Sequence, residues 1–176
     1  MVWALFNKGK IFEKMAQHPV VMNISNIILG ENSAVSSLAA NTVLPGNGGL
    51  SPSCHSCLTG LSPGQLPHLD YPYYRMQLPS TNPHILDTAP ALSLQFVTLL
   101  TDFNSGNGGT AFRPNSHHQP RYPDDKEDFY KHAIQVSGKA GDMIMFHGAL
   151  QHCAMPNRSK DMRTGILQHM APVYIK

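Results

Sequence analysis

Two short stretches of this 176-residue sequence carry the side chains best suited to chemistry. In the first, His68 and Asp70 stand two positions apart on a predicted β-strand, so both side chains would point to one face and could bind one metal ion. In the second, far downstream, His152 is followed by Arg163. Two histidines and one carboxylate on one face of an octahedron form the facial triad of non-haem Fe(II) oxygenases. We therefore predict a metal site of His68, Asp70 and His152.

Other histidines compete for the third ligand position. His147 and His152 are an odd number of positions apart, so they would not share a face of one continuous strand. His152 is preferred because it precedes a Pro-Asn turn and Arg163, which leaves His147 as a core residue or a residue behind the ligands. His117 and His118 are adjacent, and at most one of them would face the metal if they lie on a strand.

A zinc site in the Gly/Ser/Pro-rich loop at residues 47–64 is the weaker metal hypothesis. Cys54 and Cys57 have the C-x-x-C spacing of a zinc ligand pair. Structural zinc takes four ligands, and no second pair follows at the spacing of a zinc finger or ribbon. This loop is therefore not expected to contribute a metal ligand.

Composition predicts one globular domain spanning residues 1–176. The content of 41% hydrophobic and 14% charged residues suits a packed core, and 14 Gly with 14 Pro favour turns and short strands. A net charge of +2 without a Lys/Arg cluster argues against nucleic-acid binding. No apolar run is long enough for a membrane span. An odd count of three cysteines and the lack of a basic signal-peptide start favour an intracellular, cytoplasmic protein.

Hydrophobic spacing indicates the elements that must position the candidate ligands. Residues 7–30 predict two short helices, interrupted at His18-Pro19 and ending at Gly30, that support a sheet. Residues 33–45 predict a first strand. Residues 92–103 predict the strongest strand, and a Gly/Asn turn then leads to a strand at 110–114, which together predict a hairpin.

The remaining segments are predicted from polarity and turn residues. Residues 122–131 are charged and predict a solvated loop or short helix. The Gly141-Asp142 turn is expected to lead into a buried strand that ends near Phe146. The Pro- and Asn-rich residues 78–90 predict an irregular lid.

As an ordered set, these motifs resemble the phytanoyl-CoA dioxygenase family of Fe(II)/2-oxoglutarate-dependent oxygenases. The matching segments are residues 65–70, 100–103 with 107–109, 114–117, 141–146, and 152–159 with Arg163. The resemblance implies a mainly β fold, the double-stranded β-helix or jelly-roll, cupin-like barrel, with the N-terminal helices supporting it.

The resemblance also implies roles for individual residues. His68, Asp70 and His152 would hold Fe(II), Arg163 would receive the distal carboxylate of 2-oxoglutarate, and Asn41 would contact this cosubstrate near the metal. The planar guanidinium of Arg163 suits a carboxylate, which it meets with two parallel hydrogen bonds. The implied activity is O₂-dependent hydroxylation of a C–H bond in a small-molecule or acyl substrate.

Two departures from the family pattern keep alternatives open. Family members usually begin well before the segment matching Val2, so an N-terminal portion that helps cover the substrate pocket is expected to be missing. An insertion at about residues 48–64 separates the Pro45-Gly46 turn from Gln65. The alternatives are a non-catalytic or truncated metal-binding jelly-roll relative, and a cupin-like zinc or manganese hydrolase or isomerase.

Overall fold

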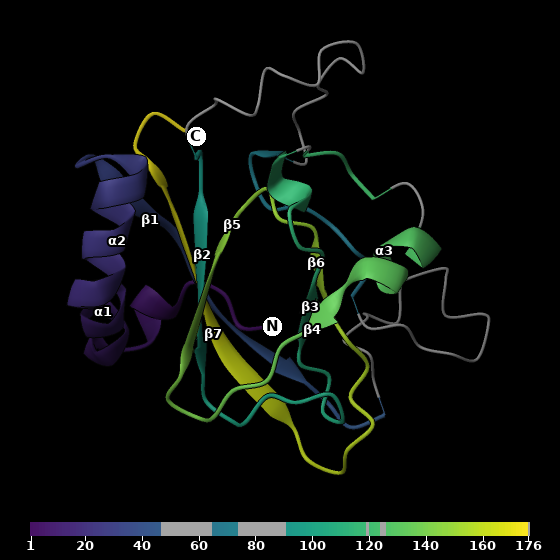
Figure 1. Ribbon diagram of the computed structural model, residues 1–176. Helices are drawn as coiled ribbons and strands as arrows, with labels where there is room; N and C mark the ends of the chain where they lie inside the picture. The colour runs from purple at the N-terminus through teal and green to yellow at the C-terminus, as the bar shows by residue number, and fades with distance from the viewer. Residues whose placement is uncertain (47–64, 74–90, 119, 124–125, 176) are drawn as a thin grey trace.

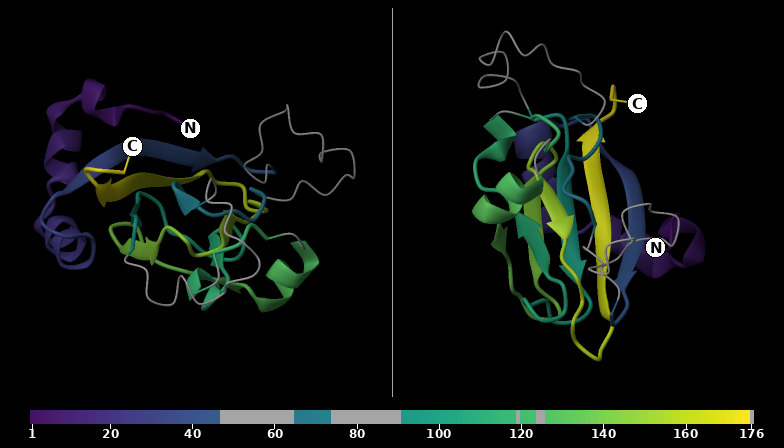
Figure 2. Two further views of the ribbon diagram at one scale, coloured as in Figure 1. Left: turned by 90° about the horizontal axis from the view of Figure 1, so that it is seen from above. Right: turned by 90° about the vertical axis from the view of Figure 1, so that its right-hand side faces the viewer.

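Two antiparallel β-sheets face each other in the computed structural model, which describes residues 1–46, 65–73, 91–118, 120–123 and 126–175 (Figures 1 and 2). Sheet A has the strand order β1-β7-β2-β5 and sheet B the order β4-β3-β6. The strands of sheet A are β1 (Ser33–Val43), β7 (Arg163–Pro172), β2 (Leu94–Leu99) and β5 (Met143–His147). The strands of sheet B are β4 (Ile134–Gln135), β3 (Thr110–Phe112) and β6 (His152–Ala154). The predicted mainly β fold is confirmed.

The N-terminal helices form where their spacing predicted them. After the 3-10 helix η1 (Leu5–Lys8), α1 (Lys10–Ala16) and α2 (Pro19–Leu29) follow, and both lie beside sheet A in Figure 1. Pro19 is the first residue of α2, a position whose N–H needs no helical partner. Gly30 ends α2 with a φ of +93°, a backbone conformation that favours glycine.

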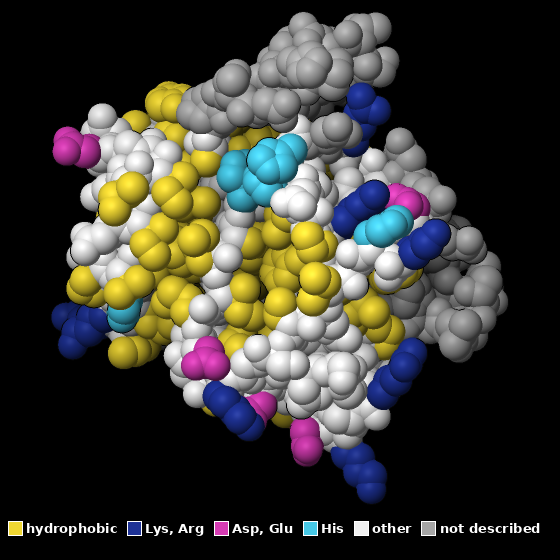
Figure 3. All heavy atoms as spheres, viewed as in Figure 1, with side chains coloured by type: hydrophobic (Ala, Val, Ile, Leu, Met, Phe, Trp, Pro, Cys, Tyr) yellow, Lys and Arg dark blue, Asp and Glu magenta, His cyan; other side chains and the backbone are white. Residues whose placement is uncertain are grey.

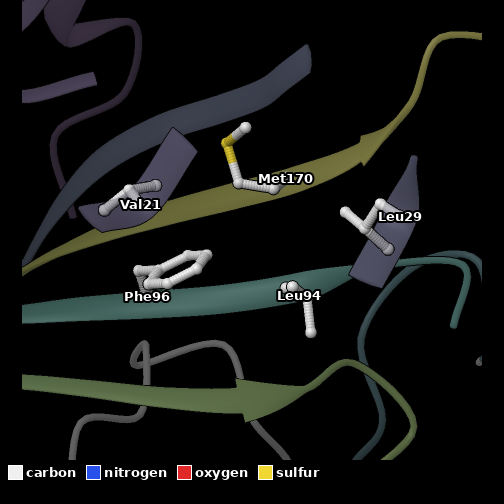
Figure 4. Close-up of a cluster of buried hydrophobic side chains, with 5 residues drawn as sticks. All are labelled: Val21, Leu29, Leu94, Phe96 and Met170. Atoms are coloured by element: carbon white, nitrogen blue, oxygen red, sulfur yellow. The ribbon is translucent and has the colours of Figure 1, made fainter. Parts of the chain in front are cut away.

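Helix α2 covers the outer face of sheet A through one apolar cluster (Figure 4). Val21 and Leu29 of the helix pack against Leu94 and Phe96 of β2 and Met170 of β7. Because side chains alternate along a strand, these contacts leave the intervening residues of β2 and β7 facing the other sheet. The helices thus determine which residues point toward the interior.

The interior between the sheets is lined by the other set of alternating residues. Its apolar cluster consists of Val97, Leu99, Phe103, Phe112 and Phe146. On the far side of sheet B, Phe129 of α3 (Lys126–His132) packs against Ala111 and Cys153. Each sheet therefore has one set of side chains packed against a helix and another set facing the opposite sheet.

Two local predictions were wrong. Strand β2 pairs with β5 and β7 in sheet A, whereas β3 pairs with β4 and β6 in sheet B, so the Gly/Asn turn between β2 and β3 crosses between sheets and forms no hairpin. Strand β5 is an edge strand rather than a buried one, and Met143 and Met145 are 37% and 43% exposed on it.

Several predictions fall on residues that the structure does not describe. These are the loop and insertion at residues 47–64 with Cys54 and Cys57, and the lid predicted at residues 78–90. Among the described residues, no helix combines the length and apolar character needed to cross a bilayer.

Candidate metal centre

His68, Asp70 and His152 lie together in the interior between the sheets. One ligand atom from each of the three residues lies within 4.8 Å of the other two. His152 begins β6, but His68 and Asp70 are not part of a longer strand as predicted. Only His68 forms a β-bridge, with His152, in which each backbone N–H donates to the other residue's carbonyl oxygen at 3.0 Å. The pairing does not continue in register, since the backbone N–H of Gln65, and not that of Leu66, donates to the Ala154 carbonyl oxygen at 2.8 Å.

Both histidines are held in the same orientation by their own backbone. The Nδ1 atom of His68 lies 2.8 Å from the Leu66 carbonyl oxygen, and Nδ1 of His152 lies 2.8 Å from the Leu150 carbonyl oxygen. A carbonyl oxygen only accepts hydrogen bonds, so Nδ1 carries the proton in each ring. This tautomer leaves Nε2 with a free lone pair, the form in which a histidine binds a metal.

The Asp70 carboxylate completes the group. Its backbone N–H donates to the Gly148 carbonyl oxygen at 2.9 Å, which anchors the segment beside the end of β5. Its Oδ2 lies 3.7 Å from Nε2 of His152 and is buried without a hydrogen-bond partner among the described residues. A buried carboxylate oxygen without a donor is costly, and a cation bound between Asp70 and the histidines would offset that cost.

Electrostatics keep His68 ready to bind a cation. Burial, followed by the nearby His152, lowers the pKa of His68 to about 4. The imidazole is therefore neutral at physiological pH and does not compete with a metal ion for its own lone pair.

Arg163 lies in the same interior as the candidate ligands but on the opposite sheet, at the start of β7. The side chain is 3% exposed, and its Nε and Nη1 atoms have no hydrogen-bond partner among the described residues. Its guanidinium carbon lies 4.3 Å from the centroid of the Phe103 ring. Burial lowers the pKa of Arg163 to about 10, so the group stays charged at neutral pH. A buried, charged fork with free donors is suited to binding a carboxylate.

One cavity of about 190 Å³ joins these groups. The three candidate ligands, Arg163 and Asn41 all line it. Asn41 lies on β1 opposite Gly165 of β7, two residues along that strand from Arg163. The role of Asn41 as a cosubstrate contact stays a prediction, since its place in the cavity allows that contact without testing it.

Two glutamines in the cavity were not predicted from the sequence. The amide nitrogen of Gln65 lies 3.2 Å from Nε2 of His68, the free lone pair of that ring. Gln95 lines the cavity from β2, and its Oε1 is buried without a partner among the described residues. Gln95 had a signal in the sequence, because alternation places this amide on the same face as Val97 and Leu99.

The other candidate histidines lie outside the group of three. Histidine side chains gather on the face shown in Figure 3, and the rings of His117, His118 and His147 are in contact, with centroids 4.0 Å and 5.6 Å apart. His117 and His118 lie in the 3-10 helix η5 (Ser116–His118) rather than on a strand, which corrects the argument from alternating faces. Nδ1 of His147 accepts a hydrogen bond from the Ala149 backbone N–H at 3.0 Å.

Comparison with known proteins gives consistent family matches. A model of the family described as phytanoyl-CoA dioxygenase (PhyH) matches residues 3–165. Dioxygenase cdmD of Talaromyces verruculosus is 32% identical over 90 residues, which cover 48% of this chain and 28% of the relative. Dioxygenase andF of Emericella variicolor is 33% identical over 89 residues, which cover 49% of this chain and 30% of the relative. These matches thus span less than a third of either relative.

Solved structures share the fold at low sequence identity. EctD from S. alaskensis, with 2-oxoglutarate and 5-hydroxyectoine, has a TM-score of 0.69 at 16% identity. The match covers 99% of this chain and 56% of the EctD chain. The non-heme alpha ketoglutarate dependent epimerase SnoN from nogalamycin biosynthesis has a TM-score of 0.67 at 16% identity. The match covers 97% of this chain and 59% of the SnoN chain. These likenesses confirm the predicted double-stranded β-helix.

Proposed function

This chain belongs to the phytanoyl-CoA dioxygenase family, and on that premise we propose that it is a dioxygenase that uses Fe(II), 2-oxoglutarate and O₂. One observation carries the proposal. A single cavity contains a carboxylate oxygen of Asp70 and two guanidinium nitrogens of Arg163 that have no hydrogen-bond partner among the described residues. A cation between His68, Asp70 and His152 would give the carboxylate a partner. A dianionic cosubstrate that extends toward Arg163 would give the guanidinium one.

The donor set fits iron. Two imidazole nitrogens, of His68 and His152, and one carboxylate oxygen, of Asp70, would hold the iron and would leave positions open for cosubstrate and O₂. The hydrogen bonds from Nδ1 to backbone carbonyl oxygens hold each imidazole plane in place, which keeps the ligand nitrogens oriented before the metal binds. When bound, the iron supplies the activation of O₂, with 2-oxoglutarate converted to succinate and CO₂ and one oxygen atom inserted into a C–H bond.

Arg163 and the apolar walls have separate roles in this proposal. Arg163 binds the distal carboxylate of 2-oxoglutarate and thereby orients its other end toward the metal. Phe103, Phe146 and Leu167 line the cavity and exclude water from the reacting atoms. Asn41 is placed to contact the same cosubstrate from β1. The substrate is a small molecule or acyl compound with a C–H bond that is hydroxylated.

The decisive experiment supplies Fe(II) and 2-oxoglutarate anaerobically, admits O₂ and measures succinate. We expect succinate from the unmodified chain and less than a hundredth as much from His68→Ala, Asp70→Ala or His152→Ala, each of which also weakens Mn(II) binding. His147→Ala is the matched control, since this histidine lies outside the ligand group.

The outcomes separate the alternatives. Metal binding without succinate, with or without candidate substrates, would indicate a metal-binding jelly-roll relative that does not turn over. Metal binding that is insensitive to 2-oxoglutarate would favour a cupin-like hydrolase or isomerase. Loss of metal in His147→Ala but not in His152→Ala would refute the assignment of the third ligand.

A further inference from the structure

Three side chains in the central cavity have buried polar atoms without a partner among the described residues. They are Oδ2 of Asp70, Nε and Nη1 of Arg163, and Oε1 of Gln95. The proposed function accounts for the first two through a cation and a carboxylate. It does not account for the third, although a buried amide oxygen without a donor is also unfavourable.

Gln95 lies beside the metal ligands and far from Arg163. Its neighbour on β7 is His169, whose Nε2 lies 3.0 Å from the carbonyl oxygen of Tyr71, the residue after Asp70. Its neighbour on β5 is Phe146, whose ring centroid is 4.6 Å from that of His152. The backbone of Arg163 is at the other end of β7, about 20 Å along the strand from that of His169 at roughly 3.3 Å per residue.

The chemistry of the unpaired atom restricts what can match it. An amide oxygen accepts a hydrogen bond, so its partner must bring an N–H or O–H group. At neutral pH, 2-oxoglutarate is a dianion with acceptors only, and a metal ion has no donor of its own. The cosubstrate that satisfies Arg163 therefore cannot satisfy Gln95.

We propose that Gln95 belongs to the binding site for the prime substrate and accepts a hydrogen bond from a hydroxyl or amide N–H near the C–H bond that reacts. This inference rests on the proposed function and narrows its substrate class. The residues between Gln95 and Arg163 in the cavity wall include Ala39, Val97 and Leu167, so an aliphatic carbon suits the space beside that donor.

Cavity size limits how much of the substrate enters. The volume of about 190 Å³ is below the roughly 300–1,000 Å³ of pockets that enclose a drug-sized ligand. Only the reacting end of a substrate would then reach Gln95, while the rest would lie at the mouth, where Trp3 lines the cavity and is 62% exposed. Trp3 is the single tryptophan of the chain and gives a fluorescence signal for occupancy.

A stability comparison tests whether Gln95 has a structural partner instead. Gln168 is the matched control, because its Nε2 donates to the Ala16 carbonyl oxygen at 2.8 Å on the outer face of β7. We expect Gln168→Met to lower the Tm by about 2–6 °C. Gln95→Met should leave the Tm equal or higher, since it removes a buried amide oxygen that has no partner among the described residues. An equal drop in both variants would assign Gln95 to the structure and overturn the proposal.

A binding comparison then tests the donor requirement. Cyclohexanol and its methyl ether differ by the hydroxyl donor, and each is titrated into metal-free and Mn(II)/2-oxoglutarate-loaded protein while Trp3 fluorescence is followed. We expect about five- to tenfold tighter binding of the alcohol, the effect of one hydrogen bond, and loss of that preference in Gln95→Met but not in Gln168→Met.

Each outcome is decisive for Gln95. A preference for the alcohol that persists in Gln95→Met, equal binding of both probes, or binding of neither would overturn the proposal. Absence of 2-oxoglutarate binding to the unmodified protein would refute the proposed function, and the alcohol preference in the metal-free protein would still report on Gln95. The two hypotheses therefore fail separately.

Discussion

Replacement of Arg163 by methionine distinguishes a ligand-binding role from a structural one, because the two roles predict changes of opposite sign in the free energy of unfolding. The guanidinium is 3% exposed, and two of its nitrogens have no partner among the described residues. Methionine keeps much of the length of the side chain and removes its charge. The metal-free and cosubstrate-free protein should therefore become more stable if Arg163 is reserved for a ligand.

The magnitude follows from the burial of the charge. Burial lowers the pKa of Arg163 from its usual range to about 10, which at about 1.4 kcal/mol per pH unit means a penalty of roughly 3 kcal/mol for the charged form. Both folded and unfolded states stay protonated at neutral pH, so the penalty is fully present there and disappears only as the pH rises above about 10. The cation–π contact with Phe103 offsets about 0.5–2 kcal/mol of this penalty. We expect a net gain of about 1–3 kcal/mol in Arg163→Met.

With 2-oxoglutarate bound, the effect of Arg163→Met on the free energy of unfolding should have the opposite sign. Loss of the charge-assisted pair should weaken 2-oxoglutarate binding by about 2–5 kcal/mol, much of it from a carboxylate left buried and unpaired. Arg163→Lys should recover only part, because lysine keeps the charge without the two parallel donors. Urea unfolding measures the first effect, and calorimetric titration of 2-oxoglutarate into Mn(II)-loaded protein measures the second.

The exposed Arg158 provides the control, and Arg158→Met should change either quantity by less than about 0.5 kcal/mol. A lower free energy of unfolding in cosubstrate-free Arg163→Met, together with unchanged 2-oxoglutarate affinity, would refute the reasoning. Arg163 would then belong to the scaffold of the barrel, and the cosubstrate assignment would be lost.

Three further predictions concern other residues. Gln65→Ala should tighten Mn(II) binding by up to about tenfold in calorimetry, because the Gln65 amide now occupies the lone pair of a ligand histidine; weaker binding would contradict this. Burial lowers the pKa of His147 to about 4, so protons favour the unfolded state as the pH falls from about 6.5 toward 4. His147→Gln should reduce that loss of stability in urea unfolding, and an unchanged loss would contradict this. Gly108→Ala should lower the free energy of unfolding by about 3 kcal/mol or more, since φ is +81° and a Cβ would overlap a backbone carbonyl oxygen; a loss below about 1 kcal/mol would contradict the geometry.

The local spacing of apolar residues was sufficient to predict the N-terminal helices and the first strand. The helices α1 and α2 and strand β1 followed from apolar spacing, Pro19 and Gly30, because these signals act within a few residues. The pairing of β2 and β3 was not predictable in this way. A Gly/Asn turn allows either a hairpin or a crossing between sheets, and the choice depends on contacts with β5, β6 and β7 that are distant in sequence.

Residue type predicted which candidate ligands come together more reliably than their local structure. His68, Asp70 and His152 meet as their chemistry suggested, although a single bridge at His68 takes the place of the strand expected around the first two. Gln65 and Gln95 were missed, because an amide in a sequence gives no sign of whether its hydrogen bonds are satisfied. That property depends on the folded neighbours of each atom, and only the assembled cavity reveals it.

The two sheets have hydrogen-bonded ladders of very different length. Strands β1 and β7 are paired from Ser33 to Val43, whereas β3 and β6 are paired only from Thr110 to Phe112, and His68 joins β6 through a single bridge. Short ladders open by local fluctuation more readily than long ones, and their amides then exchange hydrogen with deuterium in solvent. A metal ion would join the ligand histidines across the weakest part of the ladder, so deuterium uptake near His152 reports on the same opening equilibrium that limits metal retention.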